Sequence, residues 1–81
     1  MAKVLLFGRL QDIAGWRERG IEPAPQTIAA LLAQLTAEDE ALGEALAQPS
    51  VRIAVDRRIV SGDAPLGAAS EVAFMPPMSG G

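Results

Sequence analysis

One apolar stripe in the middle of the chain constrains the fold more than any other feature of the sequence. Four residues recur at intervals of three and four positions: Ile28, Leu31, Leu32 and Leu35. This spacing places them on one face of an α-helix. Thr27, directly before the stripe, is a residue type that commonly caps a helix N-terminus. A helix with one apolar face must bury that face against a second layer, which the flanking segments have to supply.

The flanking segments have the patterns of strands. Four short apolar runs are bounded by glycine, proline or turn-forming residues: 3–7, 51–55, 59–60 and 71–75. A weaker strand is expected within 17–22, and short helices are expected at 9–15 and 38–47. This order predicts an α+β fold, with one mixed sheet packed against one main helix. A helix laid across such a sheet is typical of a β-grasp domain, which we expect over residues 1–75.

The composition disfavours several classes of function. Ten acidic and seven basic residues give a net charge of −3, which argues against nucleic acid and anionic membrane surfaces as partners. The chain contains neither cysteine nor histidine, so it lacks the usual thiolate nucleophile, general base and zinc ligands. No segment approaches the roughly 20 apolar residues that span a bilayer. We expect a cytoplasmic protein with no metal and no permanently bound cofactor.

Three adjacent carboxylates, Glu38, Asp39 and Glu40, form the one cluster that could suggest a metal site. Consecutive residues do not share a helix face, so these side chains cannot converge well on one ion. We interpret them as the solvated start of a helix, where the helix dipole stabilises negative charge. Ser61 and Ser79 have no base to activate them. The chain is therefore predicted not to be an enzyme on its own.

The last six residues are mostly proline and glycine, and we expect them to form an extended, flexible tail. They are Pro76, Pro77, Met78, Ser79, Gly80 and Gly81. The two prolines forbid continuation of the last strand and stiffen the exit. At up to ~3.5 Å per residue the tail can reach roughly 20 Å from the domain. Glycine has no Cβ, so the tail can thread a narrow channel in a partner. The alternative is a frayed terminus without a role.

Blocks at both ends and in the second half of the chain carry a family resemblance: 3–10, 12–15, 53–56, 60, 63, 65–66 and 71–81. In these blocks the chain resembles the small, sulfur-carrying subunits of molybdopterin synthase, which are ubiquitin-like β-grasp proteins. The last block is the strongest match, because the family ends in an acidic residue, an apolar strand, Pro-Pro and Gly-Gly. Asp56 stands where the family often has Asn, and Met75 stands where a second Phe is common. Residues 16–25 carry no resemblance.

The resemblance implies a mechanism centred on Gly81. An ATP-dependent activating enzyme would adenylate Gly81, so that AMP is bound transiently, and a sulfur donor protein would convert the adenylate to a thiocarboxylate. The tail from Pro76 to Gly80 would enter the large catalytic subunit of molybdopterin synthase. There the sulfur would pass to a cyclic pyranopterin precursor in molybdenum cofactor biosynthesis. The chain would be a non-catalytic sulfur donor in a heteromeric complex, and the catalytic residues would belong to its partners.

Strand parity predicts a docking surface beside the tail. In the first strand Lys3 should point to solvent, so Leu5 and Phe7 share its face. In the last strand Met75 takes the outward side. The residues of these two strands predicted to face the core are Val4, Leu6, Val72 and Phe74. Because the two strands are neighbours in a β-grasp sheet, Leu5, Phe7 and Met75 are predicted to form an exposed apolar patch that binds the large subunit. The alternative is that a helix or a loop covers the patch.

Three other functions fit the same features. A sulfur carrier of another pathway, such as thiamine biosynthesis, would share the fold and the Gly-Gly end, although this chain is long for that class. A ubiquitin-like modifier would join Gly81 to lysines of target proteins. A plain interaction module would keep its function after removal of Gly80 and Gly81.

Overall fold

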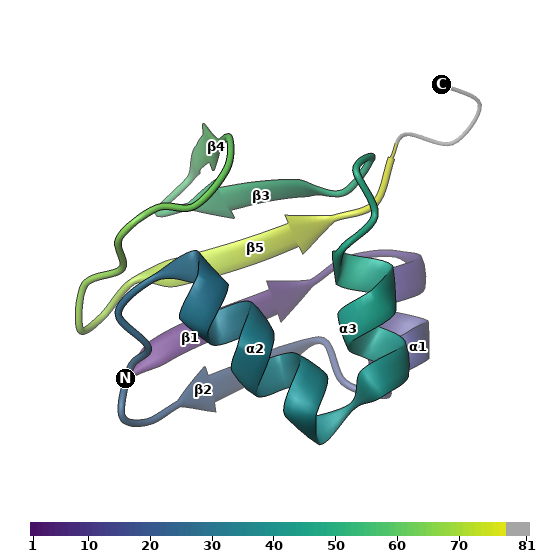
Figure 1. Ribbon diagram of the computed structural model, residues 1–81, viewed down its shortest axis with the longest axis horizontal. Coiled ribbons are helices and arrows are strands. Elements are labelled where there is room, and N and C mark those ends of the chain that lie inside the picture. Colours follow the sequence, from purple (N-terminus) through teal and green to yellow (C-terminus); the bar gives the residue numbers. More distant parts are fainter. Residues whose placement is uncertain (78–81) are drawn as a thin grey trace.

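The computed structural model describes residues 1–77, and this part of the chain contains three helices and five strands. In chain order they are β1 (Ala2–Leu6), α1 (Arg9–Ala14), β2 (Glu18–Ile21), α2 (Ile28–Glu38), α3 (Glu40–Leu46), β3 (Arg52–Val55), β4 (Arg58–Val60) and β5 (Glu71–Met75). Every helix and strand expected from the sequence is present, including the weak strand β2. Figure 1 shows their arrangement as a sheet with α2 and α3 on one face.

The five strands form one mixed sheet in the order β2-β1-β5-β3-β4. The first and last strands, β1 and β5, are parallel neighbours, and the other neighbours are antiparallel. In this register Val4 pairs with Val72, and Leu6 pairs with Phe74. Because β1 and β5 run in the same direction, the chain leaves both strands at the same end of the sheet (Figure 1).

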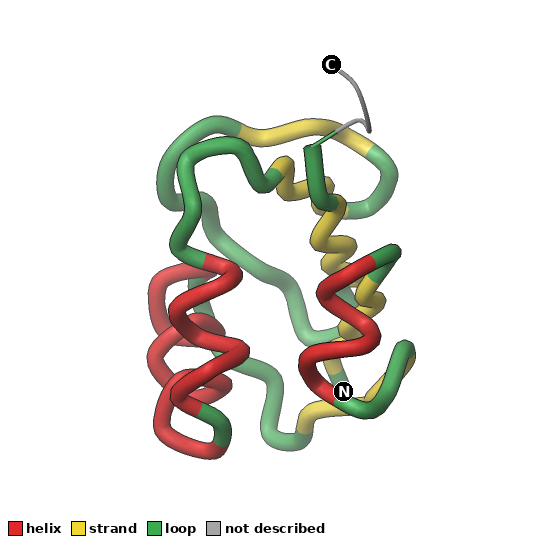
Figure 2. Tube along the Cα trace, turned by 90° about the vertical axis from the view of Figure 1, so that its right-hand side faces the viewer, coloured by secondary structure: helices red, strands yellow, loops and turns green. Residues whose placement is uncertain are grey.

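Helices α2 and α3 lie together on one side of the strands (Figure 2). α2 begins at Thr27, whose Oγ1 accepts a hydrogen bond from the Ala30 N–H at 3.1 Å. Three members of its apolar stripe are buried: Ile28, Leu31 and Leu35. α3 begins at Asp39, whose carboxylate accepts a hydrogen bond from the Leu42 N–H at 3.1 Å. The expected main helix is therefore confirmed, and α3 adds a second helix to the same layer.

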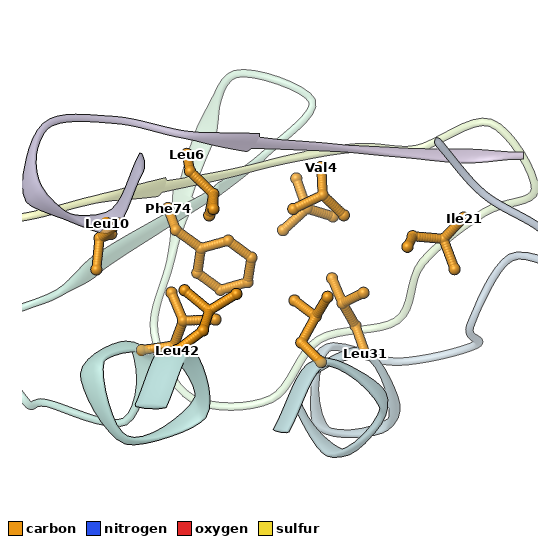
Figure 3. Packing of buried hydrophobic residues seen from close by; sticks show 10 residues of the cluster. Val4, Leu6, Leu10, Ile21, Leu31, Leu42 and Phe74 are labelled. Atoms are coloured by element: carbon orange, nitrogen blue, oxygen red, sulfur yellow. The ribbon is translucent and has the colours of Figure 1, made fainter. Parts of the chain in front are cut away.

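The core lies between the sheet and these helices. Figure 3 shows the ring of Phe74 reaching from β5 toward Leu42 of α3, and Val4 of β1 facing Leu31 of α2. The four strand residues predicted as core have at most 1% of their surface exposed: Val4, Leu6, Val72 and Phe74. Strand parity is thereby confirmed, and the opposite face of the sheet is the outer one.

The loop between β4 and β5 is tied to the start of α2. The Ile28 N–H donates to the Ala64 carbonyl at 3.0 Å, and the Ala29 N–H donates to Asp63 Oδ1 at 2.9 Å. With the Thr27 cap, these bonds satisfy three amides that a helix N-terminus leaves without intrahelical partners. The loop and the helix layer are thus fixed relative to each other.

The segment 16–25 is fastened to the helix layer through β2. Trp16 packs against the core, and the Arg19 guanidinium lies 5.3 Å from the centroid of its ring. Arg19 also forms an ion pair with Glu38 at the end of α2.

No helix within residues 1–77 is long and apolar enough to cross a membrane.

Candidate functional site

The root of the predicted tail packs against the turn that follows β1. Gly8 has φ 56° and ψ −132°, the glycine conformation at the first central position of a type II′ turn. The turn is closed by a hydrogen bond from the Leu10 N–H to the Phe7 carbonyl at 3.2 Å. A Cβ atom on Gly8 would lie 2.9 Å from Cγ of Pro76. The absence of a side chain at Gly8 therefore gives the proline ring its place beside the start of α1.

β5 ends at Met75, and the two residues that follow lie outside the strand. Pro76 is half-buried and Pro77 is exposed, and neither has an N–H that could continue the sheet. The other predicted tail residues are Met78, Ser79, Gly80 and Gly81, which lie outside the described residues. Their role in the chemistry is still a prediction.

The three residues predicted to form the docking patch lie where strand parity placed them. Phe7 has 46% of its surface exposed, while Leu5 and Met75 are half-buried. The Phe7 N–H donates to the Phe74 carbonyl at 3.2 Å, so the β1–β5 pairing extends one residue past the strand and sets Phe7 beside Met75. Phe7 is not covered by any described helix or loop, and its role in partner binding is a prediction.

The structure adds Ile59, which our sequence interpretation missed. Ile59 has 59% of its surface exposed, and it pairs with Ala54, which in turn pairs with Ala73 of β5. These pairings place it on the outer face of the sheet. We call this set the outer apolar face: Leu5, Phe7, Ala54, Ile59, Ala73 and Met75. The sequence contained a signal for this position. A two-residue turn at Asp56 and Arg57 sets the pairing of β3 with β4, and this pairing places Ile59 opposite Ala54.

Two grooves flank the tail root, and both are lined by Pro76 and Pro77. One has a volume of about 900 Å³ and runs along β3 and β4, where Ile59 and Met75 contribute to it. The other has a volume of about 430 Å³ and lies between α1 and α3, with Ile13 on its wall. A partner that encloses the tail can therefore contact the domain on both sides of its exit.

The three adjacent carboxylates have structural partners. Asp39 caps α3, and Glu38 pairs with Arg19. Across residues 1–77, acidic side chains do not gather in groups of three or more that could hold a metal ion. The chemical capacity of the described part is therefore that of a binding surface beside the point where the chain leaves β5.

Comparison with known proteins agrees with this geometry. The family model described as "ThiS family" matches residues 4–81. The molybdopterin synthase sulfur carrier subunit of Escherichia coli (strain K12) is 33% identical over 81 residues, which is all of both chains.

Solved structures show the same fold. The putative molybdopterin converting factor, subunit 1, of Pyrococcus furiosus is 30% identical with a TM-score of 0.80, and the match covers 95% of this chain and 97% of the other. SAMP1 of Haloferax volcanii is 22% identical with a TM-score of 0.82 and covers 99% of this chain and 98% of its own, which supports the ubiquitin-like β-grasp fold alone. The chain therefore belongs to the ThiS family and is a ubiquitin-like β-grasp sulfur carrier.

Proposed function

We propose that this chain is the sulfur-carrier subunit of molybdopterin synthase and that it works through the carboxylate of Gly81. One observation carries the proposal: β5 is followed directly by Pro76 and Pro77, which lie beside an exposed apolar face with a groove on each side. A partner that binds this face receives the segment after Pro77 without any rearrangement of the domain. The full-length similarity to the Escherichia coli subunit supports the choice of pathway.

The chemistry takes place on the main-chain carboxylate and needs two displacements. In an activating enzyme, a carboxylate oxygen of Gly81 attacks the α-phosphorus of ATP, pyrophosphate leaves, and an acyl-adenylate forms. The terminal sulfur of a persulfide on the donor protein then attacks the acyl carbon, and AMP leaves. A thiol of the donor cleaves the resulting S–S bond, which produces the thiocarboxylate and a disulfide on the donor. In the large subunit the sulfur passes to the pyranopterin precursor.

The chain's own contribution is to present this group. The outer apolar face provides area for docking, as exposed apolar patches commonly do. Pro76 and Pro77 restrict the backbone at the exit, which lowers the entropy lost when a tail is bound in an extended form. The large catalytic subunit, the adenylating enzyme and the sulfur donor supply the reacting side chains.

Intact mass spectrometry tests this proposal. After incubation with the activating enzyme, ATP and a persulfide donor, the mass should rise by the difference between one sulfur and one oxygen atom. Addition of the large subunit and the precursor should then yield molybdopterin and restore the original mass. The control is a variant that lacks Gly81, which should show no increase.

The outcomes separate the parts of the proposal. A mass increase that survives removal of Gly81 would refute the assignment of the sulfur site. A loaded carrier that yields no molybdopterin but supports thiazole synthesis would refute the pathway alone. Conjugates on target lysines in place of the thiocarboxylate would identify a protein modifier.

A further inference from the structure

The β3–β4 hairpin carries cations that no other described residue neutralises. Arg52, Arg57 and Arg58 are all exposed, and within residues 1–77 none of them has an ion-pair partner. The hairpin's one acidic residue is Asp56, whose Oδ1 accepts a hydrogen bond from the Glu71 N–H at 2.9 Å. Three arginines and one aspartate leave the hairpin with a net charge of +2. We call these three residues the arginine margin. It stands out in a chain whose net charge is −3.

The opposite margin of the sheet is organised differently. There Lys3 and Glu18 pair at 3.6 Å, and Arg19 pairs with Glu38 of α2. A paired cation contributes little to the potential felt by an approaching protein, because a neighbouring carboxylate offsets it. Among the described residues that belong to the strands, the arginines without an ion-pair partner are therefore Arg52 of β3 and Arg58 of β4; Arg9 and Arg17 also lack one within residues 1–77 but lie outside the strands.

The arginine margin borders the outer apolar face. Arg52 pairs with Met75 across the strands, so its side chain lies on the outer face. Arg58 pairs with Val55, which pairs with the buried Val72, so its side chain lies on the helix-facing side of the edge strand β4, next to Arg57 of the turn. A protein that covers Ile59 and Met75 therefore contacts Arg52 and comes within electrostatic range of Arg57 and Arg58 at the edge of the sheet. An apolar centre with a charged rim is the usual composition of a protein interface. Because guanidinium groups bind carboxylates in paired hydrogen bonds, the matching surface is acidic.

Protection of the sheet edge accounts for only part of this arrangement. β4 is an edge strand, and charged residues on such strands discourage pairing with other chains. Arg58 lies on that strand, but Arg52 belongs to β3, and Arg57 belongs to the turn. Arg57 also has φ 71°, a conformation in which glycine is preferred. Residues held in such a conformation are found most often at functional sites.

We propose that the arginine margin docks against carboxylates of the large synthase subunit and steers that subunit onto the outer apolar face. The inference rests on the proposed function and adds to it a charge requirement on the partner. Attraction between opposite charges speeds the encounter before contact forms, and salt screens it. Charges at the rim of an interface change association far more than dissociation.

The test compares two variants with the same net charge. Arg57→Gln with Arg58→Gln lowers the net charge by two units at the margin, and Ala30→Glu with Ala33→Glu lowers it equally on the exposed side of α2. Association and dissociation rates with the purified large subunit of the same organism are measured by biosensor between about 20 mM and about 500 mM salt. At low salt the margin variant should associate at least about fivefold more slowly than the parent, and the α2 variant should stay within about twofold. At high salt the three rates should converge, with dissociation unchanged.

Each other outcome overturns a defined statement. Absence of binding by the parent chain refutes the proposed function itself. Binding with the same salt dependence in the parent and the margin variant refutes the steering role while leaving the proposed function intact. Equal slowing by both variants assigns the effect to net charge and not to the margin.

Slower adenylation with unchanged association to the large subunit shows that the activating enzyme is the acidic partner. Self-association of the margin variant in sedimentation, with normal binding of the large subunit, shows that the arginines serve only to protect the edge.

Discussion

At the scale of single residues, the turn between β3 and β4 is built from two side chains in a conformation that favours glycine. Asp56 has φ 50° and Arg57 has φ 71°. Aspartate tolerates this region, and the Asp56 carboxylate gains a hydrogen bond from the Glu71 N–H. An asparagine, the residue common in the family at this position, has the same acceptor, so this departure leaves the turn intact. Arg57 has no comparable hydrogen bond from its side chain among the described residues.

Replacing Arg57 by glycine should therefore stabilise the free protein. We expect the free energy of unfolding to rise by about 0.5–1 kcal/mol, because glycine adopts a positive φ without a steric penalty. Urea denaturation followed by circular dichroism measures the change. Arg58→Gly is the control, since Arg58 lies in a strand and its replacement should lower stability by about the same amount. A loss of stability in Arg57→Gly would show that the arginine side chain contributes more than its backbone strain costs.

Substitution of the terminal glycines should separate activity from stability. Within residues 1–77, every residue of the core cluster lies at or before Phe74. We therefore expect Gly80→Val and Gly81→Val each to change the free energy of unfolding by less than ~0.5 kcal/mol. Sulfur transfer should be lost, because a branched side chain clashes within a channel fitted to glycine. Thermal unfolding and the yield of molybdopterin are the two measurements. A clear drop in the melting temperature would mean that these residues have a structural role.

At the scale of elements, α2 depends on a residue far from it in the sequence. Asp63 Oδ1 accepts hydrogen bonds from the N–H groups of Ala29 and Ala64, both at 2.9 Å. Asp63→Ala should lower the free energy of unfolding by about 1–2 kcal/mol, because it removes a helix cap and the anchor of a loop. Asp63→Asn keeps an acceptor and should recover most of the loss. Equal effects of the two substitutions in urea denaturation would contradict the capping role.

Local patterns predicted the elements and their parity, and the features missed depend on the register of a turn or on contacts between distant segments. Periodicity and Thr27 predicted α2, and strand alternation placed Leu5 and Phe7 outward. The second cap of α2 comes from Asp63, which no pattern near the helix reveals. The outward position of Ile59 requires the register of the β3–β4 turn. The placement of β1 beside β5 rested on the family resemblance, because alternation alone does not fix strand order.

At the scale of the whole molecule, the outer apolar face separates docking from folding. Phe7 and Met75 face away from the core, so Phe7→Ala with Met75→Ala should cost the free protein little stability. The same double variant should weaken binding of the large subunit by more than ~2 kcal/mol, as truncation of central apolar anchors often does. Isothermal titration calorimetry measures the affinity. Unchanged binding would place the interface elsewhere.

A substitution in β5 at a residue that faces the core provides the control for this experiment. Val72 is fully buried, so Val72→Ala should lower stability through loss of core contacts. It should leave the affinity of the folded protein unchanged. If the double variant behaves like Val72→Ala, the outer apolar face is structural and not a docking surface.

The parallel pairing of β1 and β5 also determines when the protein can fold during its synthesis. β5 lies between β1 and β3 in the sheet and is the last strand to be made. A nascent chain that still lacks β5 has β1 and β3 without their shared neighbour, and Val4 and Leu6 without the strand beside them. Contacts of such long sequence separation form late. The sheet is therefore completed only after residues 71–75 have left the ribosome, and a chain interrupted before them exposes a core that cellular proteases can attack.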